Sequence, residues 1–353
     1  MSVEVRNDLS ALAGYHSVQV DVEVRLNTNE SPFTLPEAYT LSLMDHISAM
    51  HLNRYPDREA TVLRRGIADI HGTTIDRVFA ANGSNEVIQS LLLAFGGPGR
   101  TALVFEPTYA LHSHIARVTG TEVVTAERGE DFILERDHVA AVAAEVDPDV
   151  LFLCSPNNPT GGVDSLELVR AALRATSGVV VVDEAYGQFA ATTALDLAQE
   201  PGADRLVVSR TFSKTWALAG VRLGYLVAHP DVVAGCARVA LPYHLSSLTQ
   251  AAGACALAHS EEMEGHVAEL VSQREALWGQ MASLDLDLWP SSANFILFRP
   301  RSKGGHDVWQ ELVDRSVLVR DCSSWDRLED CLRVTVGTAI ENARFLEALK
   351  EAL

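Results

Sequence analysis

The stretch Val179-Val180-Val181-Val182-Asp183-Glu184-Ala185-Tyr186 decides the fold. Its first four residues predict a short strand, and because no polar residue interrupts them, both faces of that strand should be buried. Similar apolar runs recur through the middle of the chain, at residues 101–105, 122–125, 150–154, 206–209 and 223–228. Helical patterns alternate with several of them, at residues 86–94, 166–175 and 231–239. This alternation predicts an α/β fold with a mostly parallel central sheet that is covered on both faces.

The pattern changes after about residue 249. A long helix is predicted at residues 250–284, followed by strands at 293–298, 317–320 and 331–336 and a closing helix at 342–353. A chain of 353 residues also exceeds the usual size of a single core, so two lobes are expected. We predict a large domain at residues 36–250, a smaller α+β domain at 251–353, and an N-terminal arm at 1–35 that packs on the small domain.

The composition is that of an ordinary soluble globular protein, with 47% hydrophobic and 21% charged residues. The net charge of −19 argues against partners such as nucleic acid or an anionic membrane, but a few converging arginines can still hold a small anion. The amino terminus lacks the apolar core of a signal peptide, and no apolar run is long enough for a membrane helix. The five cysteines are widely spread without a CxxC pair, so we predict no metal site, no disulfide framework and a cytoplasmic location.

Unusual polar residues follow three of the predicted strands. Ser155-Pro156-Asn157-Asn158-Pro159-Thr160-Gly161-Gly162 follows the first, Asp183-Glu184-Ala185-Tyr186 the second and Thr211-Phe212-Ser213-Lys214 the third. Taken singly, these segments are most simply a turn, a helix cap and a surface lysine. However, parallel strands end at one edge of a sheet, and ligands bind beyond that edge in open α/β sheets. Their joint occurrence therefore favours a ligand site with an amide, a carboxylate, a phenol and an amine.

These side chains match what a pyridoxal phosphate ring requires. A partly desolvated lysine such as Lys214 has a lowered pKa and offers a nucleophilic amine for an imine bond. Asp183 can keep the pyridine nitrogen protonated, and Asn158 and Tyr186 can reach the ring oxygen. The phosphate needs hydroxyls, a cation and free backbone N–H groups. The candidates for these roles are Thr211, Ser213, Arg222 and the apparent helix start Gly83-Ser84-Asn85-Glu86.

The chain resembles the fold-type I pyridoxal phosphate aminotransferases, and it is most similar to the histidinol-phosphate aminotransferases of actinobacteria. The resemblance runs from about Gly14 to the carboxyl terminus. Besides the segments quoted above, it depends on Arg25-Leu26-Asn27-Thr28-Asn29-Glu30-Ser31-Pro32, Asn53-Arg54-Tyr55-Pro56-Asp57, Glu106-Pro107-Thr108-Tyr109, Ala293-Asn294-Phe295 and Leu332-Arg333-Val334-Thr335-Val336-Gly337. One difference is the stretch Asp321-Cys322-Ser323-Ser324-Trp325, which lacks the further basic residue that is common there.

The resemblance implies a role for each matching residue. The catalytic residues would be Lys214, which forms the imine, with Asp183 at the pyridine nitrogen and Tyr186 at the ring oxygen. The other cofactor-binding residues would be Ser84, Asn85, Glu86, Tyr109, Asn158, Thr211, Ser213 and Arg222, with Tyr55 reaching the phosphate in the neighbouring subunit of a homodimer. The substrate-binding residues would be Tyr15, Asn29, Arg320 and Arg333.

The function expected from the resemblance is transamination between histidinol phosphate and 2-oxoglutarate in L-histidine biosynthesis. Two alternatives stay open at this point, an aromatic amino-acid aminotransferase and a pyridoxal phosphate decarboxylase acting on threonine phosphate. His112 and His114 bracket Ser113 shortly after Tyr109, and no further ligand accompanies them at a suitable spacing. We therefore expect these two histidines to lie on an ordinary helix face rather than in a metal site.

Overall fold

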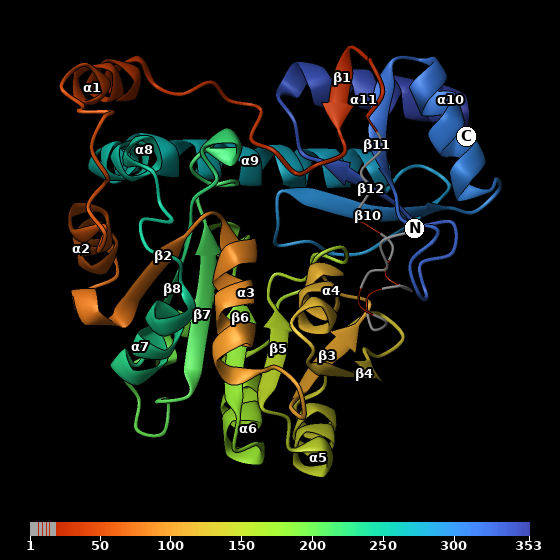
Figure 1. Ribbon diagram of the computed structural model, residues 1–353. Helices are drawn as coiled ribbons and strands as arrows, with labels where there is room; N and C mark the ends of the chain where they lie inside the picture. Colours follow the sequence, from red (N-terminus) through yellow and green to blue (C-terminus); the bar gives the residue numbers. More distant parts are fainter. Residues whose placement is uncertain (1–5, 7–8, 10–11, 13, 15–18) are drawn as a thin grey trace, which may run out of the picture.

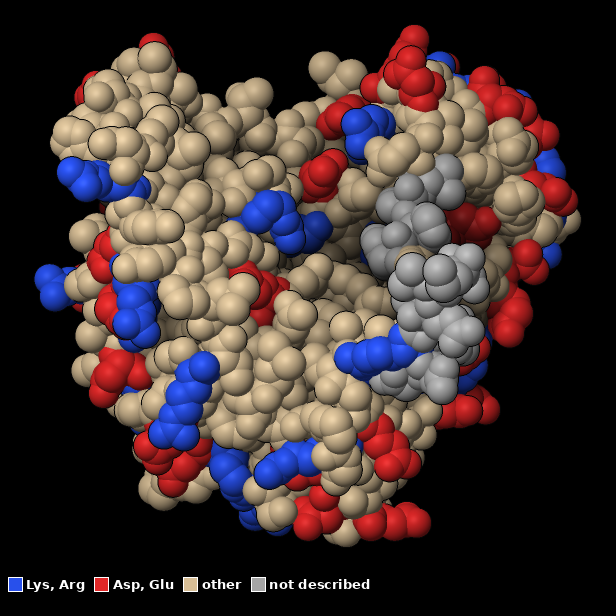
Figure 2. All heavy atoms as spheres, in the orientation of Figure 1, with Lys and Arg blue, Asp and Glu red and all other residues tan. Residues whose placement is uncertain are grey.

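The computed structural model describes residues 6, 9, 12, 14 and 19–353. Its strands form a seven-stranded and a five-stranded sheet, which lie in different parts of the molecule (Figure 1). The face drawn in Figure 2 is hollowed between these two parts. The two sheets agree with a large and a small lobe, while the boundaries after residues 35 and 250 stay predictions. In the described part of the chain, no helix is both long and apolar enough to cross a membrane.

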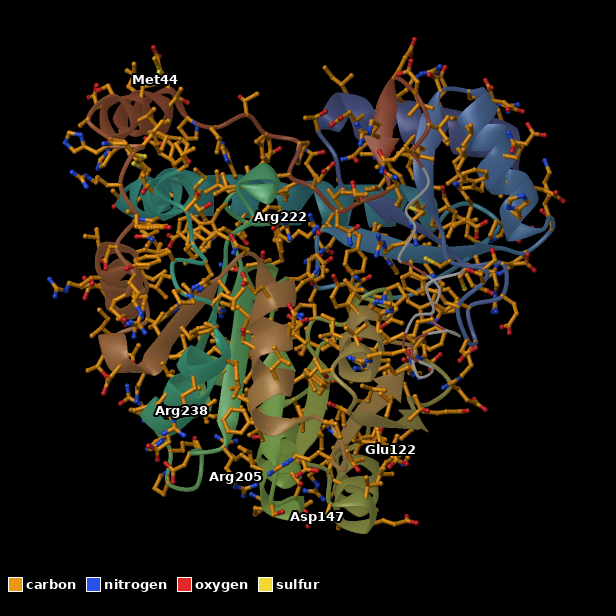
Figure 3. All side chains as sticks on the ribbon, viewed as in Figure 1. Met44, Glu122, Asp147, Arg205, Arg222 and Arg238 are labelled. Atoms are coloured by element: carbon orange, nitrogen blue, oxygen red, sulfur yellow. The ribbon has the colours of Figure 1, made fainter. Side chains whose placement is uncertain are left out.

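The large sheet has the strand order β2-β8-β7-β6-β5-β3-β4. All neighbours from β7 to β4 are parallel, whereas β8 runs antiparallel to both β7 and β2, so the prediction of a mostly parallel sheet is confirmed. Glu122, Asp147 and Arg205 mark the amino ends of strands in Figure 3, and Arg222 lies at the opposite edge. The strands are β2 (Val78–Ala81), β3 (Thr101–Glu106), β4 (Glu122–Glu127), β5 (Val150–Cys154), β6 (Val179–Asp183), β7 (Leu206–Thr211) and β8 (Gly224–Ala228).

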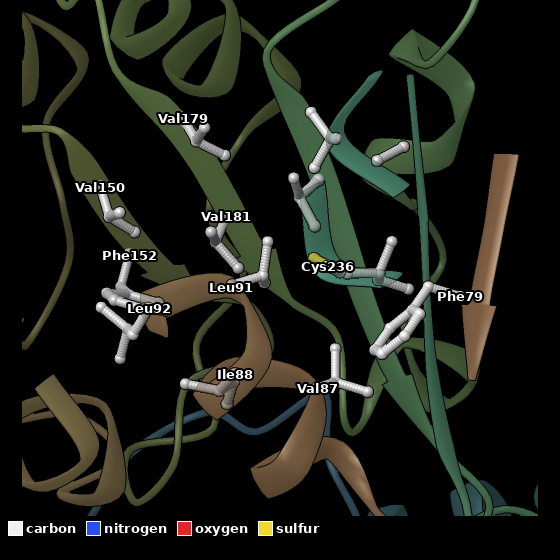
Figure 4. Packing of buried hydrophobic residues seen from close by; sticks show 14 of the residues in the cluster. Phe79, Val87, Ile88, Leu91, Leu92, Val150, Phe152, Val179, Val181 and Cys236 are labelled. Carbon is white, nitrogen blue, oxygen red and sulfur yellow. The ribbon is translucent and has the colours of Figure 1, made fainter. Parts of the chain in front are cut away.

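Helices cover both faces of this sheet, which explains the uninterrupted apolar strands. On one face α3 (Ser84–Phe95), α4 (Leu111–Val118) and α7 (Pro230–Val239) bury a cluster that includes Val181 (Figure 4). On the other face α5 (Arg136–Val146) and α6 (Leu166–Ala175) bury a second cluster that includes Val180 and Val182. Successive residues of a strand point to opposite faces, so each valine of β6 belongs to one of the two apolar layers.

The small sheet has the order β1-β11-β12-β10-β9. β1 (Val24–Leu26) belongs to the predicted N-terminal arm and adds a parallel edge strand to β11, with Val24 opposite Val317. Helices α9, α10 and α11 supply buried side chains to the core beside this sheet. The remaining elements of this lobe are β9 (Leu286–Leu288), β10 (Phe295–Pro300), α10 (Gly305–Asp314), β11 (Val317–Asp321), β12 (Leu332–Thr335) and α11 (Ala339–Ala352).

The single helix predicted at residues 250–284 is wrong. The structure has two helices there, α8 (Ser247–Ala258) and α9 (Ser260–Met281), with a break at His259. His259 has φ −118° and ψ 34°, outside the helical region, and Glu261 and Glu262 begin α9 with charges that suit a helix N-terminus. α8 packs with α1 (Glu37–Ser48) and α2 (Thr61–Ile70), whereas the far end of α9 reaches the small-lobe core.

Candidate active site

A cavity of roughly 360 Å³ lies beyond the carboxyl edge of the large sheet, and both lobes contribute to its walls. The strand register brings three predicted segments together here, because Cys154 lies opposite Asp183 and Asp183 lies opposite Ser209. Thirteen of the sixteen predicted site residues line the cavity. They are Asn29, Ser84, Asn85, Tyr109, Asn158, Asp183, Tyr186, Thr211, Ser213, Lys214, Arg222, Arg320 and Arg333.

Lys214 follows β7 and projects its amine into this cavity. Its Nζ donates a hydrogen bond of 2.9 Å to the carbonyl of Thr28 and lies 5.9 Å from the ring centre of Tyr186. Burial, with a smaller effect of the cations Arg333 and Arg222, lowers the pKa of Lys214 from 10.5 to about 7. A substantial share of this amine is therefore neutral and nucleophilic near neutral pH.

Asp183 ends β6 and is almost completely buried. Its Oδ2 lies 2.9 Å from Nε2 of His112, and its Oδ1 accepts a hydrogen bond of 3.1 Å from the backbone N–H of Ala185. His112 has no exposed surface and stacks on Phe152, with the ring centres 4.7 Å apart. Both oxygens of Asp183 thus have a polar partner, and the remaining lone pairs can accept a hydrogen bond from a pyridine N–H.

His112 is the clearest residue that the sequence analysis missed. We expected it on an ordinary helix face, and it is in α4, but that face turns into the molecule and onto Asp183. The signal that points to it is its closeness in sequence to Tyr109, which was already assigned to the site and whose ring contacts that of His112 edge-on, with the ring centres 5.4 Å apart. In the described part of the chain, no group of three or more His, Cys, Asp or Glu side chains forms a metal site.

The small lobe supplies the guanidinium of Arg333, which is 5% exposed. One terminal nitrogen donates to Oδ1 of Asn158, and the other donates to the carbonyl of Asn27 at 3.0 Å. Its Nε has no hydrogen-bond partner, and among the described residues no carboxylate lies within ion-pair distance of it. A buried cation without a counter-ion is costly, so this side chain is suited to bind an anionic ligand.

Asn29 and Tyr186 form the wall beside this arginine. The amide of Asn29 donates a hydrogen bond of 2.9 Å to the hydroxyl oxygen of Tyr186, and its oxygen accepts one of 3.1 Å from Thr335. Burial raises the pKa of Tyr186 to about 12, so the phenol keeps its proton. Because the oxygen of Tyr186 already accepts from Asn29, its hydrogen is left to donate into the cavity.

The opposite end of the cavity is lined by several hydrogen-bond donors. The 12-residue helix α3 begins at Ser84 without a side-chain cap, and the N–H groups of a first helical turn have no partner within the helix. Ser84 and Asn85 line the cavity together with Thr211, Ser213 and Arg222. Arg222 donates a hydrogen bond of 3.4 Å to the hydroxyl of Ser213, which also accepts one of 3.0 Å from Thr211. Hydroxyls, a guanidinium and helix N–H groups are the donor set that a phosphate dianion requires, so these residues fit pyridoxal phosphate.

At this end of the cavity, two glycines allow close contacts, and the first of them lets strand β8 approach the start of helix α3. A Cβ at Gly224 would lie 2.3 Å from the backbone nitrogen of Ser84, so only glycine lets β8 and the start of α3 come this close. At Gly83 the φ of +81° disfavours a residue with a side chain, and a built Cβ would lie 2.6 Å from the end of the Arg222 guanidinium, which would have to move. The bare backbone therefore shapes the phosphate end.

Three predicted residues are not among those that line the cavity. The carboxylate of Glu86 turns back to accept hydrogen bonds from the backbone and the side chain of Asn82. Tyr55 is 81% exposed and stacks on Tyr243, with the ring centres 4.5 Å apart. Tyr15 lies outside the described residues. Trp325 also lines the cavity, beside Arg320, although it was not among the predicted site residues.

The sequence is similar to the family of class I and II aminotransferases over residues 21–349. Histidinol-phosphate aminotransferases of Streptomyces avermitilis and Thermobifida fusca are each 46% identical to it, over 98% and 99% of this chain and 96% and 95% of theirs. The solved histidinol-phosphate aminotransferase of Sinorhizobium meliloti, in complex with pyridoxal-5'-phosphate, has a TM-score of 0.85 at 21% identity, covering 94% of this chain and 90% of that one. The predicted family and fold class are thus confirmed, and the chain belongs to the class I and II aminotransferases.

Proposed function

We propose that the protein is a histidinol-phosphate aminotransferase. It would use pyridoxal 5'-phosphate to transfer an amino group between histidinol phosphate and 2-oxoglutarate, in the cytoplasm and within L-histidine biosynthesis. The observation that carries the proposal is the buried guanidinium of Arg333, for which the described residues supply no counter-ion, in the same cavity as the amine of Lys214. The names of the relatives at 46% identity support the choice of substrates.

The residues of the cavity would hold the cofactor at three points. Ser84, Thr211, Ser213 and Arg222 would bind its phosphate, and Asp183, positioned by its contact with His112, would hold a proton on the pyridine nitrogen. Asn158 and Tyr186 would donate to the ring oxygen. Their acceptor atoms are already engaged by Arg333 and Asn29, which leaves their N–H and O–H groups for this purpose.

When bound, pyridoxal phosphate supplies an aldehyde for amines and a ring that takes up the electron pair left on the substrate carbon. Lys214 performs the proton transfer. Because its pKa is lowered to about 7, part of the amine is unprotonated near neutral pH and can accept the proton from the substrate carbon, and the ammonium so formed can return a proton. The depressed pKa of Lys214 therefore suits a reaction that runs both ways in two halves.

Arg333 would bind the anionic group of two substrates that differ in structure. Glutamate carries an α-carboxylate, whereas histidinol phosphate has none and carries a phosphate instead. A guanidinium fork forms paired hydrogen bonds with either group, so one residue can hold whichever anion is present. Asn158 and Asn27 fix the plane of the fork on its inner side.

The decisive experiment is a spectral titration of the purified holoenzyme with one amino donor at a time. Histidinol phosphate and glutamate should each convert the cofactor to its amine form, and phenylalanine and threonine phosphate should do so poorly. Preference for phenylalanine would replace the proposal with an aromatic aminotransferase, and release of carbon dioxide from threonine phosphate would replace it with a decarboxylase.

Lys214 can be tested separately, because the chain has only three lysines. Lys214→Ala should abolish both half-reactions and the borohydride-trapped cofactor adduct. Lys350→Ala removes an exposed lysine of α11 and should change neither. Normal turnover by Lys214→Ala would contradict the assignment.

We also propose a homodimer in which Tyr55 reaches the phosphate site of the other subunit. Tyr55 is exposed and is not among the residues that line its own cavity, and nearby segments also carry exposed apolar side chains that suit a protein partner. These include Leu52, Val62 and Leu241, which are 73–75% exposed. Leu241→Asp should therefore produce monomers in sedimentation experiments, and Tyr55→Phe should weaken cofactor retention in an intact dimer. Dimers that tolerate Leu241→Asp would count against this interface.

A further inference from the structure

The loop of residues 322–331, between β11 and β12, brings Trp325 to the cavity wall. The guanidinium carbon of Arg320 lies 5.7 Å from the centre of the Trp325 ring. Arg320 itself belongs to β11 and lies opposite Arg333 in β12, so sheet pairing fixes its backbone. Trp325 lies beyond the last paired residue of β11, and its position depends on how the loop is held.

The base of this loop is anchored in the small lobe. The N–H of Cys322 donates a hydrogen bond of 3.0 Å to the carbonyl of Cys331, and both residues are completely buried with Leu328 and Leu297. Trp325 is only partly buried against this cluster. Phe132 of the large lobe belongs to the same cluster, so packing from both lobes fixes the two ends of the loop more firmly than it fixes the indole.

Arg327 reaches out of the same loop and binds the large lobe. Its two terminal nitrogens donate to the carbonyls of Arg128 and Gly129, the second at 2.8 Å. Its guanidinium carbon lies 5.7 Å from the ring centre of Phe132, and one nitrogen lies 3.6 Å from the carboxylate of Glu127. All four of these contacts are with the end of β4 or the segment directly after it.

Two features indicate that the contact of Arg327 with the large lobe is a stable part of the fold. Arg327 has a φ of +64°, a left-handed conformation that costs free energy in a residue with a side chain and persists only where the surroundings hold it. Its target is rigid, since Arg128 is 3% exposed and pairs with the buried carboxylate of Asp164. A strained residue held by a rigid partner beside a ligand cavity points to a positioning role.

We propose that Arg327 is a positioning residue that fastens the 322–331 loop to the large lobe and so holds Trp325 against the ring end of the substrate. The inference rests on the proposed function, in which the substrate presents an imidazole ring opposite the anion bound by Arg333. An indole face stacks favourably on a planar ring and gains little from the aliphatic carboxylate of glutamate. The contact between Arg327 and the large lobe therefore serves the recognition of histidinol phosphate and not that of glutamate.

The test measures the dissociation constants of histidinol phosphate and glutamate in spectral titrations of the holoenzyme. Arg327→Gln and Trp325→Ala should each weaken histidinol phosphate binding about tenfold and change glutamate binding less than about threefold. Trp325→Phe should recover most of the loss. The matched control is Arg299→Gln, because Arg299 also pairs with a carboxylate and lies 5.5 Å from a tryptophan ring, but within its own lobe.

A double variant decides whether Arg327 acts through Trp325. If it does, adding Arg327→Gln to Trp325→Ala weakens histidinol phosphate binding no further. Additive losses, equal losses for both substrates, or unchanged constants with only a lower melting temperature would each overturn the inference. An unmodified protein that gave no half-reaction with histidinol phosphate would instead refute the proposed function, so the two failures are distinguishable.

Discussion

Replacement of Arg333 by lysine tests the central assumption of the proposed function. The guanidinium now donates to Asn158 and to the carbonyl of Asn27, while it offers its free edge to the substrate. An ammonium keeps the positive charge but cannot satisfy both of these partners and grip an anion with two parallel N–H groups. Arg333→Lys should therefore lose at least one charge-assisted hydrogen bond to whichever anion is bound.

The size of the effect follows from the strength of such a bond. A hydrogen bond to a charged group contributes about 1.5–3 kcal/mol, which corresponds to a roughly 10- to 150-fold weaker binding. Because the same fork reads a carboxylate and a phosphate, the dissociation constants of glutamate and of histidinol phosphate should rise together. Spectral titration of each half-reaction measures both constants directly.

Arg299→Lys provides the control, because that arginine pairs with Asp287 at the surface and does not line the cavity. It should leave both dissociation constants unchanged. If Arg333→Lys also left both constants unchanged, Arg333 would not be the anion-binding residue. A loss confined to one substrate would show that the two anions are read by different cations, which would equally refute the reasoning.

Three further predictions concern the cofactor end of the site. Since burial lowers the pKa of Lys214 to about 7, competitive acylation of the cofactor-free protein should titrate this amine near pH 7. In the unfolded chain the same amine keeps its proton up to about pH 10.5, so the free energy of unfolding should rise with pH between these two values. Lys214→Met should abolish this pH dependence. Gly224→Ala should displace the start of α3 and weaken cofactor retention, because its Cβ would lie 2.3 Å from a backbone nitrogen. Gly279→Ala is the control, because Gly279 is an exposed residue of α9 outside the cavity and its Cβ would meet open space, so this variant should retain the cofactor as the unmodified protein does. His112→Phe should lower the free energy of unfolding by about 1–3 kcal/mol, measured by denaturant titration, because it removes a hydrogen-bond partner of the buried Asp183.

The large lobe could be predicted from sequence because its pattern is local. Each valine of β6 packs in one of two apolar layers, and a run without polar residues predicts this burial on both faces of the strand. β1 was missed because its three residues, Val24–Leu26, form a strand only by pairing with β11. The break at His259 was missed because the composition stays helical on both sides of it.

The site was predictable where each residue follows a strand, and less so where position depends on tertiary packing. Lys214 and Asp183 are adjacent to β7 and β6, so the parallel register brings them together. His112 and Trp325 come from a helix face and a loop whose orientation no local pattern records. Glu86 follows two predicted cofactor residues in sequence, but a helix turns it toward Asn82 instead.

The pairing of β1 with β11 has a consequence for how this enzyme is made. Leu26 leaves the ribosome early, yet its neighbour Val319 is synthesised almost three hundred residues later. At ordinary translation speeds this interval is roughly 15–60 s, during which Asn27, Thr28 and Asn29 have no sheet to hold them. Any polypeptide released before its last strands would thus lack one complete wall of the pocket, and partly translated chains would be catalytically silent until synthesis ends.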